Sequence, residues 1–251
     1  MKRSQGANRK GNHMITTVMF DLDGTLLPFK QEDFVKAYFG ELCKKLAPLG
    51  YEPKHTVDSI WAGTRAMIKN DGSRLNADVF WDVFRSMNEG IPDAKPLCDE
   101  FYTNEFNRAR SILQYEVDRR PVIEALKSKG LRIVLATNPM FPRDGMVSRM
   151  GWAGLGPDDF EHVTDYENSR FCKPDPRYFL AITEKLGVTP EECVMIGNNV
   201  PEDMQAASKA GFRSVFLLPE FIENPQNEDY SMYPQGTLDN AVEYIIKLLE
   251  K

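Results

Sequence analysis

A short apolar run at residues 15–20 is the first strongly patterned segment of the chain, and polar residues and Gly24 follow it directly. A continuous apolar run that stops at a turn residue predicts a buried β-strand. Similar runs predict further strands at residues 131–136, 193–196 and 214–218, with a short strand at 160–164.

Helical periodicity fills most of the intervals between these runs. The helices expected there cover residues 119–129, a segment ending at residue 150, and residues 176–186, 202–210 and 238–249. Strands that alternate with helices predict right-handed crossovers and a parallel sheet with helices on both faces. The pattern therefore predicts an α/β, Rossmann-like fold.

One long interval breaks the alternation. No segment between residues 28 and 117 is patterned as a strand, and helices are expected at 57–69, from 76 onward and at 96–106. The first apolar helical stripe of this interval ends at Gly50 and consists of Phe34, Val35, Tyr38, Phe39, Leu42, Leu46 and Leu49. We expect a helical domain at residues 28–117, inserted into an α/β core of residues 14–27 and 118–251.

The first thirteen residues are basic and polar, without a hydrophobic segment, so no secretory signal is expected there. They predict a disordered basic extension at residues 1–13, with Met14 as a candidate native start. A nucleic-acid-binding arm is the alternative for this segment. The net charge of the whole chain is −6, so the remainder is more acidic still, which argues against nucleic acid as the main partner.

Cysteine usage and hydropathy bear on the compartment. The four cysteines are scattered without a Cys-x-x-Cys pair, which favours a reducing environment and a cytoplasmic protein. No apolar stretch approaches the roughly 20 residues that cross a bilayer, so no membrane partner is expected.

The candidate chemistry begins where the first strand ends. Asp21 and Asp23 leave the strand two residues apart, and the alternation of a strand directs both toward one face. Parallel α/β sheets bind ligands beyond the carboxyl ends of their strands. Two like charges held together there indicate a divalent cation, a phosphoryl group or both. A turn rich in Asp and Gly after an edge strand is the structural alternative.

Three later segments follow strands or precede helices in the same part of the fold. Thr137 and Asn138 end the second strand, where their side chains can donate to phosphate oxygens. Lys173, with Pro174 after it, lies just before a helix. Asn198 and Asp203 flank the start of the helix that follows a third strand. Each of these features also has a structural explanation by itself: a polar strand end for Thr137 and Asn138, a solvated lysine for Lys173, and an acid at a helix N-terminus for Asp203.

Together and in this order, the segments resemble the motifs of the haloacid dehalogenase-like (HAD) hydrolase superfamily. The first motif is an apolar strand followed by Asp-x-Asp-x-Thr, here Asp21 to Thr25. Lys173-Pro174 resembles the third motif. The fourth pattern is Gly-Asp-x-x-x-x-Asp, and Asn198 stands where its first Asp is expected. The helical insert lies between the first two motifs, where the superfamily places its first type of cap domain.

The resemblance implies a role for each motif residue. Asp21 is the expected nucleophile that forms an aspartyl-phosphate, and Asp23 the general acid and base. Thr137, Asn138 and Lys173 are expected to bind the transferring phosphoryl group, with Lys173 also counted as catalytic. The expected cofactor is Mg²⁺, with Asp21, Asp23, Asn198 and Asp203 as its ligands. Because an amide carries no charge, Asn198 removes one negative charge from the metal site unless Glu202 compensates.

The function implied is a Mg²⁺-dependent phosphohydrolase of a small phosphorylated metabolite. A phosphomutase on the same scaffold is a variant of this interpretation. A phosphate-binding or regulatory relative with little turnover is the alternative from another class, and Asn198 is the feature that favours it. The sequence specifies neither the physiological substrate nor the oligomeric state.

Overall fold

The computed structural model describes residues 14–250, so the expected extension at residues 1–13 lies outside the described part. The centre is a five-stranded sheet with the order β3-β2-β1-β4-β5, and every pair of neighbouring strands is parallel. This confirms the α/β prediction. The strands are β1 (Thr17–Phe20), β2 (Arg132–Leu135), β3 (His162–Val163), β4 (Cys193–Gly197) and β5 (Ser214–Leu217).

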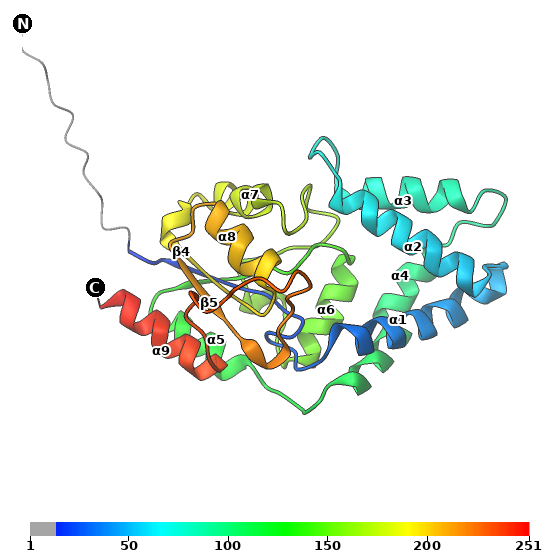
Figure 1. Cartoon of the computed structure of the whole chain (residues 1–251). Coiled ribbons are helices and arrows are strands. Elements are labelled where there is room, and N and C mark those ends of the chain that lie inside the picture. Colours follow the sequence, from blue (N-terminus) through cyan, green and yellow to red (C-terminus); the bar gives the residue numbers. More distant parts are fainter. Residues whose placement is uncertain (1–13, 251) are drawn as a thin grey trace, which may run out of the picture.

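Side-chain alternation along the strands builds two cores, one on each face of the sheet. Val18 and Phe20 of β1 pack with residues of α5 (Arg120–Lys127) and α9 (Leu238–Leu249), whereas Met19 packs with residues of α7 (Pro176–Leu186) and α8 (Ala206–Lys209). Figure 1 shows these helix pairs on opposite faces. The helices of this part are α5 (Arg120–Lys127), α6 (Arg143–Trp152), α7 (Pro176–Leu186), α8 (Ala206–Lys209) and α9 (Leu238–Leu249).

The register of the central strands brings the candidate residues to one edge. Phe20, the last residue of β1, is level with Leu135 on one side and Ile196 on the other. Asp21, Ala136 and Gly197, the next residue along each of these segments, therefore lie side by side at the carboxyl edge of the sheet. This alignment is the reason that motifs far apart in the sequence can form one site.

Between β1 and α5 the chain forms the helical insert. The helices are α1 (Gln31–Leu46), α2 (Pro53–Ile68), α3 (Asn76–Met87) and α4 (Lys95–Thr103), with 3-10 helices at Ala47–Leu49 and Glu105–Ile112. In Figure 1, α1 to α4 are gathered beside the sheet, on the side toward which the chain leaves β1. An aromatic contact joins the two parts: the Phe34 ring of α1 lies edge-on to Phe141, 5.6 Å away between centroids.

The helix expected at residues 202–210 begins differently from the prediction. A π-helical segment, Val200–Gln205, precedes α8. Asn199 explains this start, because its side chain accepts a hydrogen bond from the Glu202 N–H at 2.9 Å while its own N–H donates to Asp203 Oδ2 at 3.0 Å. These bonds hold the first turn close to the strand end.

Two expectations from composition can be compared with the described residues. None of the helices within residues 14–250 has the length and apolar character required to span a membrane. All four cysteines are free thiols.

His162 in the edge strand β3 leads to a prediction of how the free energy of unfolding depends on pH. Burial, followed by the positive charges of Lys185 and Arg143, lowers the pKa of His162 from 6.5 to about 4. Between these values the unfolded chain binds a proton that the folded chain does not, so the free energy of unfolding should fall as the pH drops from about 6.5 to about 4. In His162→Gln this loss should be smaller, as measured by urea unfolding at several pH values.

A suitable control is His55→Gln, which removes a histidine from α2. An unchanged pH dependence in His162→Gln would contradict the prediction.

Candidate active site

Lys173 is the most deeply buried charge of the site. Its ammonium nitrogen lies 2.9 Å from Asp21 Oδ1 and 2.6 Å from Asp203 Oδ1, and its side chain is 0% exposed. Burial lowers the pKa of Lys173, but the carboxylates of Asp203 and Asp21 outweigh burial and hold this pKa above its ordinary value. The lysine therefore stays charged without water contact because two acids surround it.

The two aspartates after β1 have different partners. Asp21 extends the strand, since its N–H donates to the Ile196 carbonyl at 2.9 Å. The chain then turns at Gly24, which adopts a φ of 73°. Asp23 pairs with the Arg149 guanidinium. Burial raises the pKa of Asp23, and Arg149 opposes this rise. A carboxyl with a raised pKa is suited to donate a proton.

Arg149 is a site residue that the sequence interpretation missed. It lies on α6, its side chain is 1% exposed, and its guanidinium carbon lies 4.8 Å from the Phe141 ring centroid and 5.3 Å from that of Phe34. A signal was present in the sequence. Arg149 follows Met146 by three positions and precedes Met150, so it lies on the buried face of the helix. An arginine on such a face requires an acidic partner.

The end of β2 contributes the predicted phosphate-binding residues. Thr137 and Asn138 both border the cleft that Asp21 occupies. Asn138 is held by Lys173, whose N–H donates to its Oδ1 at 3.2 Å, and its Nδ2 donates to Glu202 Oε2 at 2.9 Å. Burial raises the pKa of Glu202 to about 8, against the effect of the Lys173 charge.

The predicted metal ligands Asn198 and Asp203 are engaged by protein groups. Asn198 Oδ1 accepts from the Thr25 hydroxyl at 3.1 Å, and its Nδ2 donates to the Phe221 carbonyl at 2.6 Å. Asp203 is fully buried between Lys173 and the Asn199 N–H. Asp203 is not among the residues that border the cleft, whereas Asn198 is.

The cleft has a volume of about 260 Å³. It is lined by Asp21, Asp23, Gln31, Thr137, Asn138, Met140, Phe141, Arg149, Asn198, Asn199, Glu202 and Glu223. Glu223 is the second residue that the sequence interpretation missed, because it lies in an irregular segment without a pattern. Burial, followed by the charges of Asp21 and Asp23, raises the pKa of Glu223 to about 7.

The oxygen atoms around Asp21 and Asp23 fit a hard divalent cation. Asp23 Oδ1 is buried and has no hydrogen-bond partner among the residues that the structure describes, so an acceptor oxygen remains available at the turn. Within residues 14–250 no three His, Cys, Asp or Glu side chains gather into a ready-made metal centre. Mg²⁺ needs none, because it binds through one or two carboxylates, substrate phosphate and retained waters.

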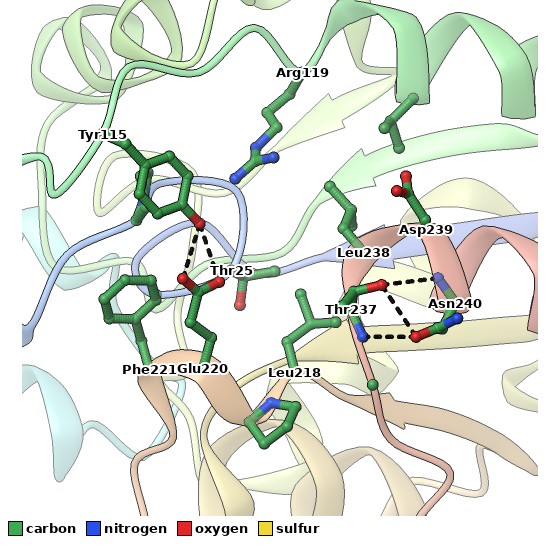
Figure 2. Close-up of a pocket in the computed structure, with 15 residues that line it drawn as sticks. Thr25, Tyr115, Arg119, Leu218, Glu220, Phe221, Thr237, Leu238, Asp239 and Asn240 are labelled. Carbon is green, nitrogen blue, oxygen red and sulfur yellow. Dashed lines mark hydrogen bonds between the residues drawn. The ribbon is translucent and has the colours of Figure 1, made fainter.

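A larger cavity, of about 630 Å³, borders the same turn through Gly24 and Thr25. Figure 2 shows its lining, in which the Tyr115 hydroxyl donates to both carboxylate oxygens of Glu220 at 3.0 Å. Arg119 also points toward this space, and its Nε donates to the Leu26 carbonyl at 2.9 Å. This cavity contains none of the carboxylates of the cleft and adjoins the segments that connect the helical part to the sheet.

Comparison with known proteins gives consistent matches. Residues 15–211 match a family model described as haloacid dehalogenase-like hydrolase. Glyceraldehyde 3-phosphate phosphatase from Methanocaldococcus jannaschii is 25% identical to this chain, and the match covers 95% of this chain and 100% of the relative's length. Phosphoglycolate phosphatase from Aquifex aeolicus is also 25% identical, and the match covers 86% of this chain and 91% of the relative's length. The magnesium-bound crystal structure of the HAD-hydrolase YfnB from Bacillus subtilis has a TM-score of 0.56 and 18% identity, covering 93% of this chain and 99% of its own.

The Arg149–Asp23 pair provides a prediction for stability. Arg149→Met should lower the free energy of unfolding by about 3 kcal/mol, because it leaves the Asp23 carboxylate largely buried without its cation. The double variant Arg149→Met/Asp23→Asn should recover much of this loss, because no unpaired charge remains. Urea unfolding at pH 7 measures both variants. Equal stabilities for the single and double variants would show that the ion pair is energetically unimportant.

Proposed function

We propose that this chain, which belongs to the haloacid dehalogenase-like hydrolase family, hydrolyses a small phosphate monoester with the help of Mg²⁺. The observation that carries the proposal is the placement of Asp21. Its carboxylate ends the central strand, borders the cleft and lies 2.9 Å from the buried ammonium of Lys173. Asp23, two residues later, borders the same cleft.

The proposed first step uses both aspartates. A carboxylate oxygen of Asp21 attacks phosphorus while the bond from phosphorus to the ester oxygen breaks, and an aspartyl-phosphate forms. Asp23 gives its proton to the departing oxygen, which leaves as an alcohol. Burial favours the protonated form of Asp23 that this step requires.

The second step reverses the role of Asp23. Its carboxylate accepts a proton from water as the water oxygen attacks phosphorus, and the bond to Asp21 breaks. Inorganic phosphate is released and both aspartates return to their starting states. Through both steps, Thr137 and Asn138 in the lining of the cleft offset the negative charge of the phosphoryl oxygens. Lys173 is not part of that lining, and its charge acts from behind Asp21, 2.9 Å from the Asp21 carboxylate.

Oxygen atoms of the turn are the proposed metal ligands. The Asp21 carboxylate and the main-chain carbonyl of Asp23 would hold Mg²⁺, which supplies positive charge to the phosphoryl oxygens when bound. We assign Asn198 and Asp203 supporting roles, since their side chains are already bound to protein groups.

Two features favour a small substrate. The cleft volume of about 260 Å³ is below the range typical of sites for drug-sized ligands. Relatives that match over most of this chain are named for glyceraldehyde 3-phosphate and phosphoglycolate, both small phosphate esters. A phosphate ester of a few carbon atoms is therefore the proposed substrate class.

The alternative is a phosphate-binding relative with little turnover. The Arg149–Asp23 pair favours it, because a paired Asp23 is less free to transfer protons. The two functions differ in a simple assay: a phosphatase releases phosphate from p-nitrophenyl phosphate with Mg²⁺, whereas a binding protein retains phosphate affinity without turnover.

We further propose that helices α1 to α4 act as a cap over the cleft. Gln31 at the start of α1 lines the cleft together with the core aspartates. The two connections to the core contact each other, since the Gln114 N–H donates to the Pro28 carbonyl at 2.8 Å. Paired connections of this kind form a natural hinge for an inserted segment.

Replacement of the nucleophile tests the reaction. Asp21→Asn should lower turnover of p-nitrophenyl phosphate by at least about a thousandfold, because an amide oxygen cannot form the phosphoryl intermediate. Asp144→Asn, an exposed position in the first turn of α6, is the matched control and should retain full activity. Substantial Mg²⁺-dependent activity in a folded Asp21→Asn variant would exclude Asp21 as the nucleophile.

Solution scattering tests the cap. Inorganic phosphate with Mg²⁺ should reduce the radius of gyration, because closure of the helical part over the cleft makes the molecule more compact. Chloride at matched ionic strength is the control. Identical profiles with and without phosphate, at concentrations that saturate binding, would contradict closure.

A further inference from the structure

Asn198 cannot easily be exchanged for the acid that the family pattern places there. Its Nδ2 donates to the Phe221 carbonyl at 2.6 Å, and only a donor can occupy that position. Its Oδ1 accepts from Thr25 on the turn that carries Asp23. The amide therefore links the Asp23 turn to the segment after β5, and both of its ends are used.

The same segment brings an acid to the cleft. The Glu223 N–H donates to the Asn198 carbonyl at 2.9 Å, and the Glu223 carbonyl accepts from the Val200 N–H at 2.9 Å. The side chain is fixed as well, because Glu223 Oε2 accepts from Asn199 Nδ2 at 3.0 Å. Main-chain and side-chain bonds thus hold this carboxylate beside the fourth motif and in the lining of the cleft.

Within residues 14–250, no cation pairs with the Glu223 carboxylate. Asp21 is paired with Lys173 and Asp23 with Arg149. Glu202 and Glu223 also border the cleft, and the carboxylate of each accepts from a side-chain amide, of Asn138 and Asn199 respectively. Arg149 is the only Lys or Arg among the lining residues of the described chain. The acidic side chains that line the cleft therefore outnumber the cations there, which favours a bound cation.

We propose that Glu223 supplies the negative charge that Asn198 does not, and holds the Mg²⁺ of this site through a coordinated water. The assignment rests on the proposed function, because it concerns the same cation. It replaces Glu202 as the compensating acid, since Glu202 is bound to Asn138 on the side of the β2 end. Asn198 holds the Asp23 turn and the segment after β5 together through its hydrogen bonds, and Glu223 provides the negative charge near the metal.

Calorimetric titration with MgCl₂, without substrate, tests the assignment. Glu223→Gln should weaken Mg²⁺ binding by about tenfold, the lower end of the loss typical when an outer-shell partner of a metal is removed. Glu228→Gln is the matched control, because it removes the same charge from an exposed position of the same segment and should leave the affinity within about twofold. Melting temperatures in EDTA establish that both variants are folded.

Glu223→Asp separates charge from the hydrogen bond to Asn199. It keeps the carboxylate on a shorter side chain and should bind Mg²⁺ more tightly than Glu223→Gln. It also provides the comparison with wild type if Glu223→Gln does not fold.

The possible failures are distinguishable. Wild-type protein that binds Mg²⁺ together with a Glu223→Gln variant of equal affinity would overturn the role of Glu223 alone. Equal weakening in Glu223→Gln and Glu228→Gln would also overturn it, because general charge loss would then explain the effect. Wild-type protein without Mg²⁺ affinity would overturn both this assignment and the Mg²⁺ dependence of the proposed function.

Discussion

The buried ammonium of Lys173 is the constraint on which the site depends. A charge with no water contact is tolerated only where opposite charges surround it, and here Asp21 and Asp203 do so. The three residues come from the end of β1, the segment before α7 and the turn after β4. Asp203 folds back over the strand end so closely that a Cβ at Gly197 would clash with its carboxylate. The lysine thus fixes three chain segments at the carboxyl edge of the sheet.

A second buried pair connects this edge to the helical part. Arg149 joins Asp23 from α6, and its guanidinium also contacts the rings of Phe34 in α1 and Phe141. The Asp23 carboxylate is therefore in contact, through one cation, with the surface between the helices and the sheet. A change in the position of α1 would alter the surroundings of Arg149 first and those of Asp23 through it.

The sequence predicts most of the fold because its signals are local. Apolar runs mark β1, β2 and β4, whose side chains are buried on both faces, and glycines mark helix ends such as Gly50 and Gly187. The match to the family model confirms the resemblance seen in the motifs. The π-helical start after β4 was missed, because it depends on hydrogen bonds between the Asn199 and Asp203 side chains and nearby main-chain groups.

The candidate site was predictable only as far as its motifs are continuous in the sequence. Arg149 lies 126 positions from Asp23, and no periodicity encodes which acid a buried arginine will meet. Glu223 lies in a segment whose place is set by its backbone bonds to Asn198 and Val200 rather than by any pattern. Such pairings appear only when the sheet has aligned its strands.

Asn198 shows how a departure from a motif can be consistent with the site around it. An acid at this position would place two acceptors against each other, because the Phe221 carbonyl lies 2.6 Å from the amide nitrogen. The amide avoids that conflict and closes the turn through Thr25. The segment that imposes the amide is also the one that delivers the Glu223 carboxylate to the cleft. The loss of charge at one residue and its supply by another are thus two consequences of the same backbone pairing.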